Sequence, residues 1–224
     1  LVNSTENESI PSNVEDGINY ISDNSVVLVL DAPYKDFVYV SGSFNNWEPD
    51  ESYIMKKDPD TSKFWLVVDN LDSEIDHTYQ YWVVDLEPLE NSPELVKTAD
   101  PYSHVVLSPF DDPWIPENSY PNLPIYPEGQ EREVTLLNLS SNEYNWQVEN
   151  FEKPKKEDLI IYEVLIRDFD SERTFQNLID KIDYFKNLNI NAIELMPVME
   201  FEGNESWGYN TAFHMAVDKY YGPE

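Results

Sequence analysis

The sequence predicts an all-β sandwich followed by an α/β segment, on three observations. Short runs of β-branched and aromatic residues, separated by turn signals, fill the first half of the 224-residue chain. Prolines then recur through a stretch that has no hydrophobic periodicity. An apolar strand, an amphipathic helix and a second strand follow that stretch, in the order and spacing of a βαβ unit.

These patterns divide the chain into four parts. Residues 1–16 are polar, and we expect a mobile tail there. The sandwich takes residues 17–108, a connector rich in proline and aromatic residues takes 109–157, and the α/β part takes 158–224. Aromatic residues are too frequent in the connector for a free linker, so we expect it to be pinned across the surface of both domains.

Strands in the sandwich are expected wherever β-branched runs end at turn residues. Their spacing over about 100 residues is typical of an all-β sandwich. The expected strands are 25–30, 37–40, 53–57, 64–68, 78–84 and 105–107, and one more lies in the connector at 133–139.

The α/β part begins with a nearly continuous apolar strand at Leu159–Ile166, as in parallel strands that are buried on both faces. Thr174 is the expected N-cap of the helix, and Asn189 is expected at its left-handed C-terminal position. Ala192–Met196 is the second strand. The apolar helix positions fall on one face and are expected in the core: Phe175, Leu178, Ile179, Ile182, Phe185 and Leu188.

Composition excludes several classes of function. A net charge of −30 makes nucleic acid and anionic membranes unsuitable partners, because binding either depends on clustered Lys and Arg. The chain has no cysteine, its 3 histidines show no ligand spacing, and we expect no metal site. No apolar run reaches the roughly 20 residues of a transmembrane segment.

The stretch Ile190–Gly222 is the best candidate for a site. Its apolar strand stops at Pro197 and continues into a loop that carries Trp207 and Tyr209. Proteins of the α/β class bind ligands at the carboxyl ends of parallel strands. A Trp-Gly-Tyr loop taken alone is nevertheless more often a packing element than a binding site.

The same residues resemble a known family. Ile190–Pro197, the Trp207-Gly208-Tyr209-Asn210 loop and Asp218–Gly222 are similar to the first βα steps of the α-amylase superfamily, glycoside hydrolase family 13, and Tyr162–Phe169 resembles its first barrel strand. Val40–Trp47 resembles the starch- and glycogen-binding carbohydrate-binding module family 48. The resemblance implies the start of a (β/α)8 TIM barrel, its first βαβ unit only, behind an immunoglobulin-like sandwich.

The resemblance also implies roles for three aromatic residues. Tyr209 matches the family tyrosine that stacks on the sugar beside the scissile bond, and Trp207 either joins it or supports the loop. Trp47 matches a glucan-stacking tryptophan of the module. Gln80 stands where the glycogen-binding version often has a lysine, so the module either binds glucan or serves as a docking domain.

The catalytic acids that the resemblance implies belong to later barrel strands, so we expect no catalytic residue in this chain. Retaining glycosidases need two carboxyl groups about 5 Å apart. Asp168 and Glu194 are poor substitutes: we expect Asp168 to pair with Arg167 or Arg173, and Glu194 to point into a polar network. About 65 residues cannot close a barrel. We therefore expect the chain to be a C-terminally truncated piece of a longer enzyme and to be inactive alone.

The resulting hypothesis is an amylase-type, retaining enzyme that hydrolyses or transfers α-glucosidic bonds in starch- or glycogen-like polysaccharides and oligosaccharides. One alternative is a non-catalytic glucan-binding or regulatory β-sandwich protein, and another is a structural scaffold domain. Calcium is implied only for the full enzyme, and no cofactor is expected in this chain. The lack of cysteine and the polar leader suit an exported bacterial protein, at the cell surface, in the periplasm or outside the cell.

Overall fold

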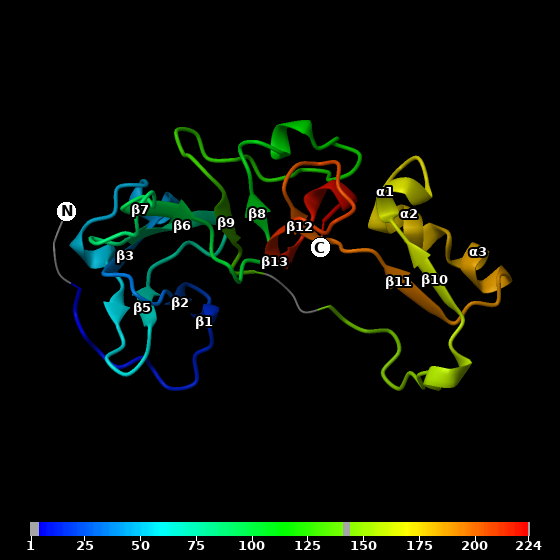
Figure 1. The fold of residues 1–224 in the computed structure, drawn as a ribbon, viewed down its shortest axis with the longest axis horizontal. Coiled ribbons are helices and arrows are strands. Elements are labelled where there is room, and N and C mark those ends of the chain that lie inside the picture. Colours follow the sequence, from blue (N-terminus) through cyan, green and yellow to red (C-terminus); the bar gives the residue numbers. More distant parts are fainter. Residues whose placement is uncertain (1–4, 141–143, 224) are drawn as a thin grey trace. The chain divides into compact units, whose positions relative to one another are not determined.

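The computed structural model describes residues 5–140 and 144–223, and its chain divides into two compact units (Figure 1). The first unit comprises residues 1–109 and 125–141, and the second comprises 110–124 and 142–224. Residues of the connector therefore belong to both units.

The first unit is a β-sandwich of two sheets, as the sequence predicts. One sheet has the order β1-β2-β5-β4, and the other has β3-β6-β9-β8, with β7 paired to β6. Every strand pair in both sheets is antiparallel. The strands are β1 (Gly17–Ser22), β2 (Ser25–Asp31), β3 (Phe37–Gly42), β4 (Lys56–Lys57), β5 (Lys63–Val68), β6 (His77–Val84), β7 (Leu95–Thr98), β8 (Val106–Leu107) and β9 (Val134–Leu137). Two 3-10 turns lie between β3 and β4, namely η1 (Ser43–Asn45) and η2 (Glu51–Tyr53).

Alternating side chains of the two sheets meet in one core. Leu28 of β2 and Phe64 of β5 are fully buried against Tyr79 and Tyr81 of β6. Both tyrosine hydroxyls donate to the buried carboxylate of Asp100, at 2.8 and 2.9 Å, so the polar ends of two core residues are satisfied by one acceptor. Burial raises the pKa of Asp100.

All the strands expected in the sandwich and the connector have counterparts, but β1 and β7 were not expected from the sequence. The prediction of a mobile tail is wrong for residues 5–16. Ile10 and Val14 pack against Trp65 and its neighbours on β2, and the indole nitrogen of Trp65 donates to the carbonyl oxygen of Glu8 at 3.0 Å. The two apolar side chains of this otherwise polar segment thus hold it against the sandwich. Residues 1–4 of the predicted tail lie outside the described residues.

The second unit contains a parallel pair of strands joined by helical segments, and a separate antiparallel hairpin. The pair β10–β11 has Ile161 opposite Ala192 and Val164 opposite Leu195. Hairpin β12–β13 follows it in the chain. The elements are η3 (Asp112–Trp114), η4 (Lys156–Asp158), β10 (Ile161–Val164), α1 (Ile166–Phe169), α2 (Phe175–Asp180), α3 (Ile182–Asn187), β11 (Ala192–Leu195), β12 (Met199–Phe201), β13 (Thr211–Val217) and η5 (Lys219–Tyr221).

The helix boundaries are confirmed. The hydroxyl of Thr174 accepts from the backbone N–H of Asn177 at 3.1 Å, which is an N-cap, and Asn189 has a φ of 57°. The single predicted helix is nevertheless divided into α2 and α3 at Lys181 (φ −93°, ψ 10°). Phe185 is buried as expected, whereas Ile179, Ile182 and Leu188 are 61%, 46% and 46% exposed, so the prediction of core positions there is wrong.

The prediction that the first apolar strand is buried on both faces is also wrong. Ile160 and Ile161 are more than half exposed. Their sheet consists of β10 and β11 alone among the described residues, so little covers its faces.

Candidate functional site

The loop between β12 and β13, residues 202–210, carries two of the predicted site residues and is called the site loop below. Tyr209 is 70% exposed and Trp207 is 61% exposed. Between them, Gly208 has a φ of 88°, and a Cβ on it would lie 2.2 Å from the carbonyl oxygen of Pro197, two residues after the end of β11. Glycine therefore lets the loop backbone rest on the strand end while the two flanking rings remain open to solvent.

Hydrogen bonds fix the shape of this loop. The Ser206 hydroxyl accepts from the backbone N–H of Gly208 at 2.9 Å and also bonds the side chain of Asn210. The Asn210 amide donates to the carbonyl oxygen of Glu202 at 3.1 Å, and the Thr211 hydroxyl donates to that of Gly208 at 3.1 Å. The rings are thus presented from a preformed turn, which lowers the entropy cost of binding a ligand.

An exposed ionic network adjoins the site loop. Glu205 of the loop contacts Arg173 at 2.9 Å and Arg167 at 3.8 Å. Arg167 also donates twice to Asp168, at 2.7 and 2.9 Å. This pairing holds the pKa of Asp168 below its ordinary value, so the expectation that Asp168 pairs locally is confirmed. A carboxylate held in this way is a poor general acid.

Glu194 does not enter a polar network, contrary to expectation. It is exposed on β11, directly opposite Glu163 of β10 in the parallel register. The structure accordingly brings Asp168 and Glu194 into no catalytic arrangement.

A buried ionic cluster lies at the base of the hairpin. Lys219 is 2% exposed, its ammonium bonds the carboxylate of Glu200, and it lies 3.3 Å from a carboxylate oxygen of Asp112. Burial opposes the charge on Lys219, but the neighbouring carboxylates outweigh it and raise the lysine pKa. Burial raises the pKa of Glu200 to about 7 and that of Asp218 to about 6.

Sequence reasoning missed this cluster. Asp218 and Lys219 lie inside a family motif, and the partners of Lys219, Glu200 and Asp112, lie far away in the chain. A charged pair inside an aromatic-rich run was the one available signal.

Trp47, the third predicted site residue, lies in the first unit after η1. It is partly buried, and it has a left-handed backbone (φ 61°), as does Asn46 before it (φ 54°). Its backbone N–H donates to the carbonyl oxygen of Gly42 at 2.9 Å. The Asn45 amide fixes the same turn by donating to the carbonyl oxygen of Val40 at 2.9 Å.

Gln80 has a structural role. It is fully buried, and its amide nitrogen donates to the carbonyl oxygens of Glu131 and Glu133 at 3.1 and 3.3 Å. Its amide oxygen accepts from the indole of Trp82 at 2.9 Å. A side chain with these partners is not available to assist Trp47 in holding a ligand.

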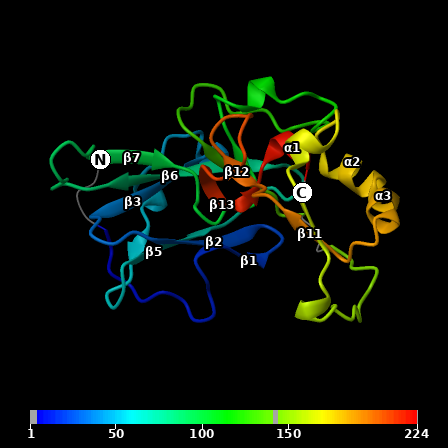
Figure 2. The same ribbon diagram turned by 45° about the vertical axis from the view of Figure 1, so that its right-hand side comes forward.

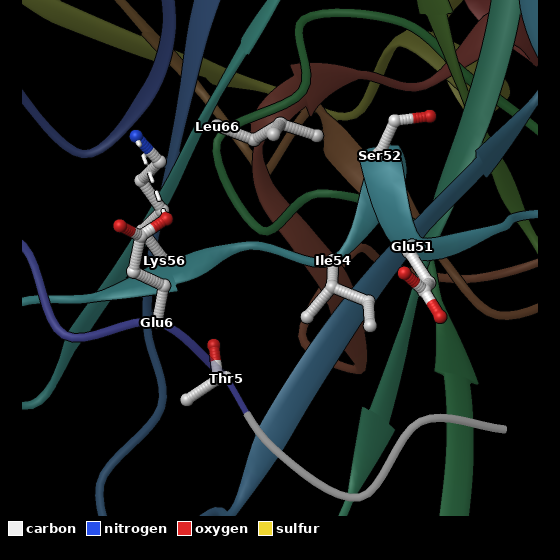
Figure 3. A pocket seen from close by; sticks show the side chains of 7 residues that line it. All are labelled: Thr5, Glu6, Glu51, Ser52, Ile54, Lys56 and Leu66. Carbon is white, nitrogen blue, oxygen red and sulfur yellow. Dashed lines mark ion pairs between the residues drawn. The ribbon is translucent and has the colours of Figure 1, made fainter.

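A cavity of about 470 Å³ lies at the edge of the sandwich. Figure 3 shows residues 5 and 6 on one side and η2 on the other, with Lys56 directed toward Glu6. None of the predicted site residues lines it, and its walls contain no aromatic ring on which a sugar could stack. The lining residues are Thr5, Glu6, Glu51, Ser52, Ile54, Lys56 and Leu66.

The described residues contain no group of three or more His, Cys, Asp or Glu side chains that could hold a metal ion. In the same part of the chain, no helix has the length and apolar character needed to cross a membrane.

No family model matches the chain. A malto-oligosyltrehalose trehalohydrolase of Saccharolobus solfataricus is 36% identical over 127 residues, which cover 57% of this chain and 21% of that protein. A 1,4-alpha-glucan branching enzyme of Chlamydia caviae is 28% identical over 206 residues, which cover 88% of this chain and 24% of that protein. The homologues of this chain are enzymes of glycoside hydrolase family 13.

Solved structures agree with this family 13 resemblance at the level of the fold. A pullulanase of Bacillus acidopullulyticus has a TM-score of 0.65 and 18% identity, with 92% of this chain and 25% of that chain covered. A mutant pullulanase of Paenibacillus barengoltzii, complexed with maltotriose, has a TM-score of 0.65 and 18% identity, with 94% and 33% covered. The chain spans about a quarter or less of the two curated family 13 relatives named above.

Gly208→Ala should destabilise the site loop more than Gly203→Ala. Both glycines have positive φ, 88° and 81°, so both substitutions incur the backbone strain of about 1 kcal/mol. Only at position 208 does the new Cβ clash with Pro197, whereas nothing lies within 4 Å of it at 203. In denaturant unfolding, Gly208→Ala should therefore lower the free energy of unfolding by about 2 kcal/mol more than Gly203→Ala does. Equal losses of unfolding free energy in the two variants would contradict the close approach of Gly208 to Pro197.

Glu200→Gln should change how stability depends on pH. The pKa of Glu200 rises from 4.5 to about 7 on folding, so its favourable contribution is present at low pH and is lost as pH rises through that range. The unfolding free energy of the wild type minus that of Glu200→Gln should fall by about 3 kcal/mol between pH 4.5 and 7. Parallel stability curves for the two proteins would show that Glu200 does not titrate in this range.

Proposed function

We propose that this chain is part of an α-glucan-active enzyme of glycoside hydrolase family 13, amylase-type and retaining, which hydrolyses or transfers α-glucosidic bonds. The observation that carries the proposal is the site loop, in which two exposed aromatic rings are held at the end of a parallel strand. Flat sugar faces bind such rings through their C–H groups. The names of the homologues support this substrate class.

The finer architecture belongs to the same proposal. The parallel pair β10–β11 and the helices between its strands would be the first βαβ unit of a (β/α)8 barrel, occupying residues 158–224. The sandwich at residues 17–108 would be an immunoglobulin-like module of family 48, and 109–157 would connect the two. The exposed apolar faces of β10 and β11 support the barrel assignment, because barrel strands are normally covered on both sides.

The chain alone is proposed to be inactive. Asp168 is paired with Arg167, and Glu194 is exposed beside another glutamate. The two carboxylates of a retaining glycosidase must therefore be supplied by other parts of the enzyme. Calcium, if the full enzyme uses it, would also be bound elsewhere.

Tyr209→Ala should lower the affinity for maltooligosaccharides about five- to tenfold, because it removes one sugar–ring stacking contact. Tyr209→Phe keeps the ring and should lose much less of this affinity. Calorimetric titration of the full-length protein with maltotriose measures both. Tyr34→Ala is the control, since Tyr34 is 94% exposed in the first unit. Unchanged affinity in Tyr209→Ala would reject the site loop as a sugar site.

The alternative is a non-catalytic glucan-binding or regulatory role for the sandwich. Trp47 remains the candidate contact there, but because Gln80 is unavailable we expect at most a weak site. Trp47→Ala should reduce retardation on amylopectin gels about two- to threefold, less than Tyr209→Ala does. Retardation that depends on Trp47 alone would favour the binding-module role, and retardation independent of Trp47 would favour docking.

A further inference from the structure

A segment of the second unit, residues 110–124, runs beside hairpin β12–β13 and is called the strap. Figures 1 and 2 show its short helix η3 above the hairpin in both views. The strap is separated from the hairpin by about 80 residues of sequence, so its position depends on specific tertiary contacts.

Three contacts tie the strap to the hairpin region. Lys219 reaches Asp112 of η3 at 3.3 Å. The side-chain amide of Asn204, in the site loop, donates to the carbonyl oxygen of Asp111 at 2.9 Å. At the other end, a Cβ on Gly222 would lie 3.2 Å from the carbonyl oxygen of Ser119, so the two backbones are in close contact. The strap is held both at the site loop and at η5.

The contact with Lys219 is the one that is hardest to break. Lys219 and Asp112 are 2% and 8% exposed, and separating them would leave a buried charge without compensation. Asp112 is therefore a fixed point, and the orientation of η3 around it is restricted.

Trp114 lies two residues beyond that fixed point. It ends η3 and is 75% exposed, although indole is the largest apolar side chain that a protein has to bury. Trp114 is thus an exposed tryptophan on a turn that tertiary contacts hold in place, next to a loop that exposes Trp207 and Tyr209. Such a ring offers a flat surface on which a sugar can stack. Rigid aromatic platforms bind with little loss of side-chain entropy.

We propose that the strap presents Trp114 as an additional stacking site for an α-glucan chain that extends from the site loop, with Asp112 and Lys219 as its positioning residues. This inference rests on the proposed function of the site loop. The ligand class follows from the shared chemistry: every glucose unit of such a chain offers an apolar face, and a longer chain can contact more than one ring.

Chain length is the variable that tests the proposal. In the full-length protein, Trp114→Ala should lower the affinity for maltohexaose about three- to tenfold and leave that for maltotriose unchanged. Trp114→Phe keeps an aromatic ring and should retain part of the maltohexaose affinity that Trp114→Ala loses. Trp146→Ala is the matched control, because Trp146 belongs to the same unit, is 78% exposed and packs its ring against that of Tyr144.

The positioning role has its own measurement. Asp112→Asn should reduce the affinity for maltohexaose selectively, and adding it to Trp114→Ala should cause no further loss, since both remove the same contact. A structural role alone would lower the melting temperature and would affect maltotriose and maltohexaose equally. That result would remove Asp112 from the proposal.

The outcomes for Trp114 and Tyr209 are separable. If Tyr209→Ala weakens binding of both sugars and Trp114→Ala weakens neither, the additional site is overturned and the proposed function stands. If Tyr209→Ala has no effect, the proposed function fails. The inference, which rests on that function, then fails with it.

Discussion

The buried ammonium of Lys219 is the interaction on which the second unit depends. It joins β12, through Glu200, to η3, through Asp112, and η5 supplies the lysine itself. The adjacent Asp218 caps η5 by accepting from the N–H of Tyr220 at 2.9 Å, and it also accepts from the N–H of Phe201 at 3.2 Å. One charge thus connects three segments that are too short to bury a core of their own. Its energetic value lies in specificity, because any other arrangement of these segments would leave a buried charge unpaired.

In the first unit, apolar packing holds the segments together instead. Its core is formed by strand residues that alternate between the two faces of each sheet, and the polar groups inside it converge on Asp100. Gln80 performs a similar task on β6 by bonding the backbone at residues 131 and 133. A position that the family resemblance associates with ligand binding is therefore used here to hold the polypeptide chain together.

The fold could be predicted from sequence where local patterns determine it. Residues 25–30 and 64–68 are β-branched runs between turns, and both became central strands; Thr174 and Asn189 mark helix ends through their own backbone chemistry. Prediction failed where distant partners decide the result. Ile10 and Val14 dock because an apolar sheet face is available to them, and Ile160 is exposed because its sheet has few neighbours. Periodicity indicates which residues could be buried, but not what covers them.

The candidate site shows the same division. Trp207 and Tyr209 could be selected from the sequence because glycine between two aromatic residues after a strand end is a local signal. The contacts made by Asp112, Glu200 and Asn204 could not, since each has its partner at least 19 residues away in the chain. The presence of aromatic rings was predictable, whereas the framework that holds them was not.

The contact of Gly208 with Pro197 has a consequence for how such a surface can diversify. The turn is shaped by the close approach of Gly208 to Pro197 and by the hydrogen bonds of Ser206 and Asn210, and none of these contacts involves the side chains of residues 207 and 209. Residues 207 and 209 can therefore vary independently of the fold. Exchanging one ring for another at these positions would alter the proposed sugar contact without rebuilding the turn that presents it.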